Sequence, residues 1–93
     1  MVNLVVILGA GESGTGAALL AKVKGFDVFV SDQGTIKDKY RDDLLRNKIE
    51  FEEGSHTELK ILNASLVVKS PGIPDKAEII KKISSHTDFA LMT

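Results

Sequence analysis

The chain of 93 residues contains neither cysteine nor tryptophan. Without cysteine it can form no disulfide and no thiolate metal site, which is consistent with a reducing compartment. Its apolar runs are far shorter than the roughly 20 residues that a membrane-spanning helix needs. The N-terminus also lacks the basic region and small-residue cleavage site of a signal peptide. We therefore expect a cytoplasmic protein with no membrane partner.

The chain has no excess of either charge, since 12 Lys and Arg residues and 13 Asp and Glu residues give a formal net charge of −1. Nucleic-acid-binding surfaces are basic, so we expect no nucleic-acid partner. Neither histidine, His56 or His86, has a second ligand at metal spacing, and we expect both at the surface and no metal site. No Ser/His/Asp arrangement, H-E-x-x-H motif or P-loop occurs. The sequence therefore predicts no catalytic residue in this chain.

Apolar segments typical of strands alternate with segments typical of helices. We expect strands at residues 2–8, 27–31, 49–52, 64–69 and 86–93, and helices at 13–24, 37–48, 55–62 and 75–84. This alternation predicts βαβ units with right-handed crossovers. The fold class is therefore α/β, a Rossmann-like three-layer domain with a five-stranded, mainly parallel sheet of order 3-2-1-4-5.

The apolar residues within these segments predict which faces are buried. In the first helix the buried face is expected to hold Ala17, Leu20 and Ala21, and in the second Tyr40, Leu44 and Leu45. The segment 49–52 alternates apolar and acidic residues, which predicts a strand near a sheet edge.

The first strand runs directly into Gly9-Ala10-Gly11-Glu12-Ser13-Gly14, a G-x-G-x-x-G sequence. In such loops Gly9 permits a tight turn, Gly11 allows close approach of a phosphate, and Gly14 lets the helix pack on the strand. The helix N-terminus adds partial positive charge. The loop therefore predicts a phosphate site, although a glycine-rich turn without a ligand would have the same sequence.

Asp32 follows at the end of the second expected strand, where related folds place an acid that binds a ribose diol. No arginine follows it closely, so a ribose 2′-phosphate has no partner, which argues against NADP more than against NAD. The alternative is a turn aspartate, because Ser31-Asp32-Gln33-Gly34 is itself a favourable turn sequence.

A second cluster, Ser70-Pro71-Gly72, follows the fourth expected strand. Proline and glycine there predict a rigid loop that offers backbone groups and the Ser70 hydroxyl. In the expected strand order this loop faces the glycine loop across a crevice at the carboxyl ends of the strands. The alternative is a stiff connector without a ligand.

Taken together, these features resemble the N-terminal domain of the Mur ligases, which build the peptide of bacterial peptidoglycan. The residues that carry the resemblance are Val6-Ile7-Leu8-Gly9-Ala10-Gly11-Glu12-Ser13-Gly14, Val28-Phe29-Val30-Ser31-Asp32 and Val67-Val68-Lys69-Ser70-Pro71-Gly72-Ile73. The resemblance implies a Rossmann-like domain that holds the UDP part of a UDP-muramoyl substrate.

Carried over by position, the resemblance divides the expected UDP site into three parts. The diphosphate would meet the backbone of the glycine loop, and the uridine would lie against the turn after the second strand. The implied residues are Gly11, Glu12, Ser13 and Gly14 for the diphosphate, Asp32, Gln33 and Gly34 for the uridine, and Ser70, Pro71 and Gly72 for the opposite wall. The family often has threonine or arginine near positions 33 and 34, so Gly34 leaves no side chain to cover the uracil from that side.

The resemblance is greatest to the D-glutamate-adding branch of the family. It implies that residues 1–93 are the N-terminal domain of a longer monomeric ligase, whose central ATPase and C-terminal domains lie outside this chain. With ATP and Mg²⁺ the whole enzyme would join D-glutamate to UDP-N-acetylmuramoyl-L-alanine, while this part would bind no cofactor and anchor the UDP part alone. Two alternatives stay open from the residues: an NAD-binding module of a dehydrogenase or sensor, and a ligand-free domain that mediates protein contacts.

Overall fold

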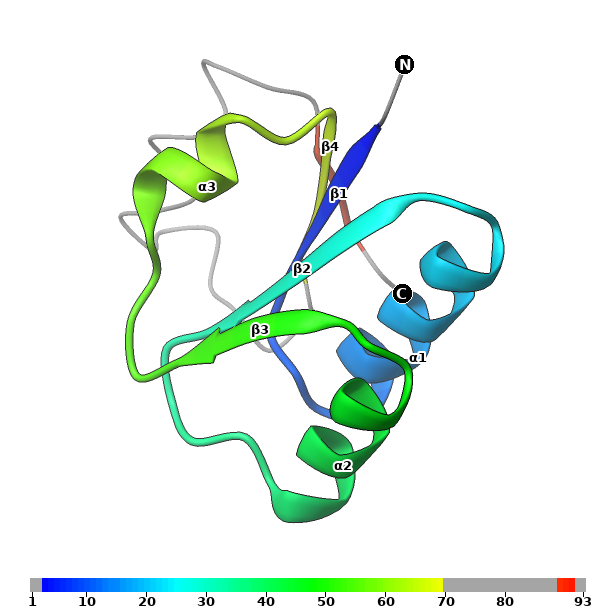
Figure 1. Cartoon of the computed structure of the whole chain (residues 1–93). Helices are drawn as coiled ribbons and strands as arrows, with labels where there is room; N and C mark the ends of the chain where they lie inside the picture. Colours follow the sequence, from blue (N-terminus) through cyan, green and yellow to red (C-terminus); the bar gives the residue numbers. More distant parts are fainter. Residues whose placement is uncertain (1–2, 70–88, 92–93) are drawn as a thin grey trace.

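A parallel β-sheet forms the centre of the computed structural model, which describes residues 3–69 and 89–91 (Figure 1). Its strands are β1 (Leu4–Leu8), β2 (Asp27–Asp32), β3 (Glu50–Glu53), β4 (Leu66–Lys69) and β5 (Phe89–Leu91). The helices of the described part are α1 (Glu12–Val23), α2 (Asp38–Arg46) and α3 (Glu58–Leu62). The helix expected at residues 75–84 lies outside the described residues.

The strands of the described part form a five-stranded sheet of order β3-β2-β1-β4-β5. The neighbouring pairs in this sheet are all parallel. The expected strand order is therefore confirmed, and β3 is the edge strand that its acidic alternation predicted. The order reverses between β1 and β4, so a crevice for a ligand is expected at the carboxyl ends of these two strands.

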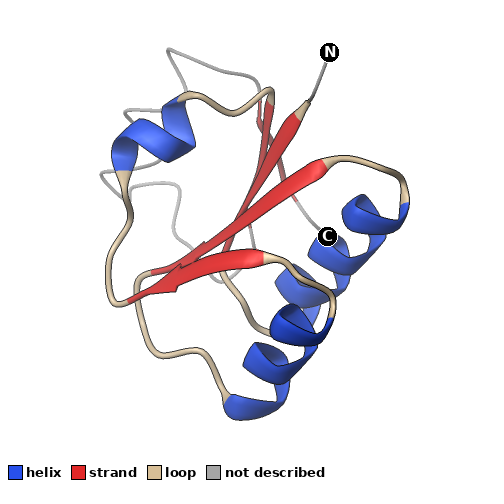
Figure 2. Cartoon of the chain, viewed as in Figure 1, coloured by secondary structure: helices blue, strands red, loops and turns tan. Residues whose placement is uncertain are grey.

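The helices cover both faces of the sheet, which confirms the three-layer arrangement (Figure 2). Alternate residues of β1 point to opposite faces. Val5 and Ile7 belong to the core cluster that includes residues of α1 and α2. Val6 and Leu8 belong to a second cluster with Ile61 of α3. Because β1 is buried on both faces, it needs the continuous aliphatic run that the sequence shows.

Helix α1 begins one residue earlier than expected, with Gly11 as its N-cap, and Gly25 follows its end with φ 93°. Its buried positions are Gly14, Thr15 and Ala18. The expected burial of Leu20 is wrong, because that side chain is 58% exposed. Leu20 lies about 200° around the helix from Ala18, at 3.6 residues per turn, and so points away from the sheet.

Helix α2 ends two residues earlier than expected. Lys48 adopts the left-handed conformation, φ 58°, which terminates the helix before Ile49 enters the core. Leu44 is fully buried as predicted, whereas Leu45 is 59% exposed, so the expected burial of Leu45 is wrong. Leu45 follows Leu44 and therefore lies about 100° further around the helix axis. The face of α2 that contacts the core spans a smaller angle, so Leu45 lies outside it.

Candidate functional site

The glycine loop after β1 has the backbone geometry that its sequence predicted. Gly9 has φ 99°, a conformation that favours glycine, and its N–H donates to the Ser31 carbonyl of β2 at 2.8 Å. A Cβ added at Gly14 would lie 1.8 Å from the Gly9 carbonyl oxygen. The tight turn at Gly9 and the close packing at Gly14 are therefore confirmed.

The same loop presents unused backbone donors at the N-terminus of α1. Within the described residues, the N–H groups of Glu12 and Ser13 have no hydrogen-bond acceptor, and both residues are exposed. A Cβ built on Gly11 meets nothing within 4 Å, so open space lies over the backbone at this point. This combination of helix dipole, free donors and space can accommodate an anion. The ligand itself stays a prediction.

Asp32, at the end of β2, connects the glycine loop to the turn that follows. One carboxylate oxygen accepts the Ala10 N–H and the other accepts the Gly34 N–H, each at 2.8 Å. The Gly34 bond is the turn contact expected of an aspartate at this position. Each carboxylate oxygen can accept a further hydrogen bond, so these contacts leave acceptor capacity for a ligand. Gln33 and Gly34 are exposed beside it, and the ribose contact stays a prediction.

The expected opposite wall, Ser70, Pro71 and Gly72, lies outside the described residues. The strand that leads to it is described, and Lys69 at its end pairs in register with Leu8 of β1. The chain therefore leaves β4 beside the point at which β1 enters the glycine loop. This adjacency is what the expected crevice requires.

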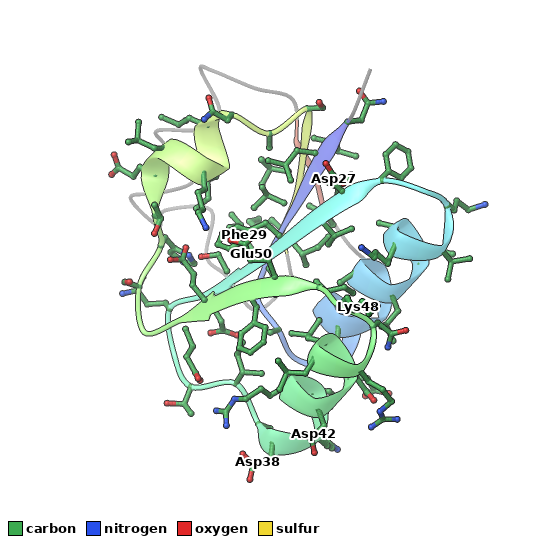
Figure 3. All side chains as sticks on the ribbon, viewed as in Figure 1. Asp27, Phe29, Asp38, Asp42, Lys48 and Glu50 are labelled. Atoms are coloured by element: carbon green, nitrogen blue, oxygen red, sulfur yellow. The ribbon has the colours of Figure 1, made fainter. Side chains whose placement is uncertain are left out.

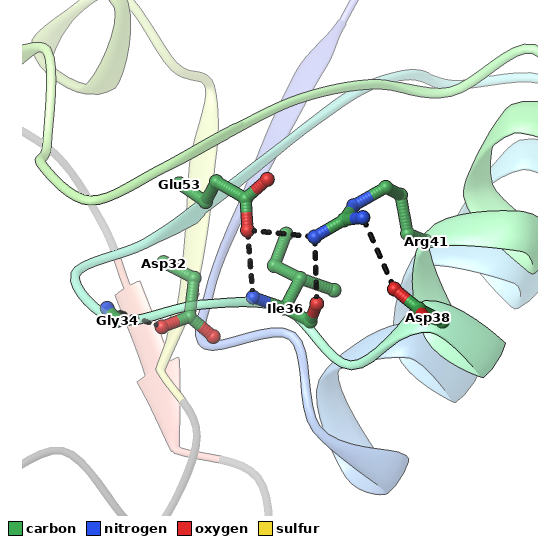
Figure 4. Close-up of polar contacts among 6 residues, drawn as sticks. All are labelled: Asp32, Gly34, Ile36, Asp38, Arg41 and Glu53. Atoms are coloured by element: carbon green, nitrogen blue, oxygen red, sulfur yellow. Dashed lines mark hydrogen bonds and ion pairs between the residues drawn. The ribbon is translucent and has the colours of Figure 1, made fainter.

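A hydrogen-bond network that the sequence did not predict holds the segment between β2 and α2 (Figure 4). Glu53 at the end of β3 accepts the Ile36 N–H at 2.8 Å, and Arg41 of α2 donates to Glu53 at 3.1 Å and to the Ile36 carbonyl at 3.0 Å. The only signal in the sequence was the acidic end of the predicted edge strand, which does not by itself fix which residue lies beside Asp32. The observed register pairs Asp32 with Glu53.

A second polar cluster lies behind Asp32, and it corrects the expectation that His56 is a surface residue. His56 is half-buried, and its Nδ1 lies 2.6 Å from the hydroxyl of the buried Ser31. That hydroxyl also lies 2.8 Å from a Glu52 oxygen, and Glu52 accepts both the N–H and the hydroxyl of Thr57. Since Ser31 has one proton to donate to Glu52, a proton on His56 Nδ1 completes the cluster. The cluster fixes the chain between β3 and α3.

Burial and hydrogen bonding shift the pKa values in this cluster. Burial lowers the pKa of His56 below 6.5, against the opposing effect of the Glu52 and Asp32 carboxylates. For Glu52, burial raises the pKa, but the hydrogen bonds from Thr57 and Ser31 outweigh it and the net pKa lies below 4.5. In each case the folded state binds protons less readily than the unfolded state.

Acidification is therefore expected to destabilise the chain in two stages. Because both folded pKa values are lowered, stability is complete above the unfolded values and is lost as pH falls, first below about 6.5 through His56 and then below about 4.5 through Glu52. Urea unfolding at a series of pH values measures this. In His56→Gln the upper stage should disappear while the lower stage remains. An unchanged upper stage in that variant would contradict the assignment.

A hollow of about 450 Å³ lies at the other end of the sheet, away from the glycine loop. Its lining includes residues near the starts of β1, β2 and β3, and lysines from α1, from α3 and from the segment before β3. The lining residues are Leu4, Lys22, Asp27, Val28, Phe29, Lys48, Glu50, Lys60 and Asn63. Figure 3 labels Asp27, Phe29, Lys48 and Glu50. Ligands of open parallel sheets bind at the carboxyl ends of the strands, so this hollow is not the candidate site.

Two absences concern the described residues alone. No group of three His, Cys, Asp or Glu side chains among them could hold a metal ion. No helix in this part of the chain is long and apolar enough to cross a membrane.

Comparison with known proteins shows the family. The MurD N-terminal domain profile matches residues 4–79. The UDP-N-acetylmuramoylalanine–D-glutamate ligase of Bacteroides thetaiotaomicron is 63% identical over 82 residues, which are 88% of this chain and 18% of that protein. The ligase of the same name from Porphyromonas gingivalis strain W83 is 60% identical over 93 residues, covering 92% of this chain and 21% of its own length. The chain thus spans about a fifth of these curated relatives.

Solved structures confirm the fold. A pseudomurein peptide ligase type C from Methanothermus fervidus superposes with a TM-score of 0.84 at 23% identity, covering 96% of this chain and 19% of that protein. At 23% identity this structural similarity shows the fold alone. The family is shown by the sequence profile, which matches well over half of the residues. The chain belongs to the MurD N-terminal domain family.

Proposed function

We propose that this chain anchors the UDP part of UDP-N-acetylmuramoyl-L-alanine in a ligase that adds D-glutamate to it. The observation that carries the proposal is the open, donor-rich N-terminus of α1 beside Asp32 at the carboxyl edge of the sheet. Proteins named for this reaction are its high-identity relatives.

The proposed site has a donor part and an acceptor part. The N–H groups of Glu12 and Ser13, with Gly11 and Gly14 beside them, would bind the diphosphate, because a helix N-terminus stabilises negative charge. Asp32 would accept hydrogen bonds from the ribose hydroxyls, with Gln33 and Gly34 at the border of the uridine. Ser70, Pro71 and Gly72 complete the proposal as the opposite wall.

We place the chemistry of the ligase outside this chain. Residues 1–93 correspond to about a fifth of the relatives' length, and the described part contains no cluster of metal-ligating side chains. We infer that ATP, Mg²⁺ and D-glutamate bind to the remaining domains and that this domain is not catalytic alone. We further propose that the whole enzyme is monomeric and cytoplasmic.

Titration of the chain with UDP and with NAD⁺, followed by amide NMR spectra, tests the proposed ligand. UDP is expected to shift the amides of Gly11, Glu12, Ser13 and Gly34, with a dissociation constant of about 1 mM, since a domain that lacks most ligand contacts binds weakly. Inorganic phosphate at equal concentration is the control for a simple anion effect, which should leave the Gly34 amide unchanged. Micromolar binding of NAD⁺ without UDP binding would favour the dinucleotide alternative and refute the proposal.

A further inference from the structure

We propose that Glu53 and Arg41 act as positioning residues that hold the loop of residues 32–36 in the conformation that receives the uridine. The inference rests on the proposed function, since it concerns the loop that carries Asp32, Gln33 and Gly34. Neither Glu53 nor Arg41 would touch the ligand. They would set its affinity by ordering the loop before binding.

The first support is a closed ring of hydrogen bonds around Ile36 (Figure 4). Glu53 accepts the Ile36 N–H at 2.8 Å, Arg41 donates to the Ile36 carbonyl at 3.0 Å, and the same Arg41 nitrogen donates to Glu53 at 3.1 Å. Both backbone groups of Ile36 are therefore bonded to side chains of other elements. Ile36 is also only 1% exposed and belongs to the hydrophobic core. Its backbone and its side chain therefore both fix the end of the loop that leads to α2.

The second support is that the end of β3 also fixes the near end of the loop. The N–H of Gly54, the residue after Glu53, donates to the carbonyls of Asp32 at 2.9 Å and Gly34 at 3.0 Å. The Asp32 carboxylate in turn accepts the N–H groups of Gly34 and Ala10. A continuous set of bonds thus runs from Glu53 through the loop to the glycine loop.

The third support is electrostatic. Glu53 pairs in register with Asp32, so two acidic residues stand side by side at the proposed uridine border. The Ile36 N–H, and to a smaller extent Arg41, hold the pKa of Glu53 below 4.5, against partial burial and, less strongly, the Asp32 charge, which both raise it. Glu53 therefore stays an ionised acceptor at neutral pH, and Arg41 offsets the repulsion that Glu53 meets from Asp32.

These contacts are better explained by positioning than by global stability. The Arg41 and Glu53 side chains are 31% and 34% exposed, and ion pairs with that degree of exposure contribute little to folding. A loop that is already ordered loses less conformational entropy when it binds a ligand, which raises affinity without a new contact. Removal of Glu53 should therefore affect the loop and the ligand more than the fold.

The test compares Glu53→Ala with Glu53→Gln, and uses Glu50→Ala as the matched control. Glu50 is an acidic residue of the same strand whose ion pair, with Lys60, lies away from the loop. In Glu53→Ala we expect the UDP dissociation constant to rise about fivefold and hydrogen exchange of the Ile36 and Gly34 amides to accelerate about tenfold, as expected for local opening. Glu53→Gln keeps one acceptor for Ile36 and should lie between Glu53→Ala and the wild type. Glu50→Ala should match the wild type in both measurements.

The outcomes separate this proposal from the proposed function. If the wild type binds UDP and Glu53→Ala binds it equally well, the positioning role is refuted and the UDP site stands. If exchange accelerates equally in β1 and α1, the effect is global and the positioning role is also refuted. If the wild type shows no UDP shifts, the proposed function fails and this proposal fails with it. If Glu53→Ala does not fold, the UDP dissociation constant and the amide exchange are compared in Glu53→Gln and the Glu50→Ala control instead. A Glu53→Gln variant that matches the control in both measurements refutes the positioning role.

Discussion

Replacing Gly14 by alanine is expected to destabilise the fold by more than about 3 kcal/mol, the upper part of the range for overpacked sites. The added Cβ would lie 1.8 Å from the Gly9 carbonyl oxygen and 2.8 Å from the Gly9 carbonyl carbon. Both are backbone atoms, so no side chain can rotate away, and the N-terminus of α1 must move off the strand. Urea unfolding measures the change.

Gly16→Ala is the matched control for Gly14→Ala. Gly16 lies in the same helix, is exposed, and a Cβ there meets nothing within 4 Å. Alanine is the better helix former, so Gly16→Ala should stabilise the chain by about 0.5–1 kcal/mol. Both variants carry the same glycine-to-alanine change. Changes of opposite sign in the free energy of unfolding would therefore be assigned to the close approach of α1 to β1 at Gly14. A Gly14→Ala variant as stable as the wild type would show that the contact is not rigid.

The strand order was predictable because glycine marks the element ends and aliphatic runs mark the central strands. β1 is a continuous aliphatic run buried on both faces, which only an interior parallel strand requires. β3 alternates acidic and apolar residues, and it forms the edge. With these two strands placed, right-handed crossovers leave few topologies for the rest.

The buried faces of the helices were only partly predictable, because they depend on how each helix is rotated on the sheet. Leu20 and Leu45 are apolar and stand at helical spacing from other apolar residues, yet both are more than half exposed. In α1 the close approach at Gly14 fixes the rotation, so that Thr15 and Ala18 point inward. The glycine motif predicted the close packing at Gly14, but the apolar spacing used to assign the buried face did not take that constraint into account.

The candidate site was predictable in its backbone and not in its supporting side chains. The positions of Gly9 and Gly14 follow from a short local motif, and that of Asp32 from its place at the end of the second strand. The contacts of Glu53 with Ile36 and Arg41, and of His56 with Ser31, depend on the register of β2 against β3. That register joins residues about 20 positions apart, and no local pattern specifies it.

The two interpretations of Asp32, a turn aspartate and an acid that binds a ribose diol, are compatible with each other. Asp32 makes the turn contact to Gly34 and also bonds Ala10, so it orders the loop without a ligand. The same bonds orient its carboxylate at the edge where a ribose is proposed. A residue whose ligand-free contacts fix its rotamer is well suited to bind a diol, because little entropy is lost on binding.

Replacing Gly11 by alanine is expected to weaken UDP binding at least about thirtyfold, or roughly 2 kcal/mol, while the fold is retained. A Cβ at Gly11 meets nothing within 4 Å, and φ −83° is open to any residue. The methyl group would instead occupy the space in which the proposed diphosphate would approach the N–H groups of Glu12 and Ser13. Amide titration with UDP measures the loss.

Gly16→Ala again serves as the control, since it adds the same methyl group to the same helix, outside the proposed site, and should bind UDP as the wild type does. Unfolding of Gly11→Ala should stay within about 1 kcal/mol of the wild type, because alanine is a somewhat poorer N-cap than glycine. Normal stability with lost binding would assign Gly11 to ligand approach. Wild-type affinity in Gly11→Ala would mean that the diphosphate does not lie against this backbone, and the proposed division of the site would be wrong.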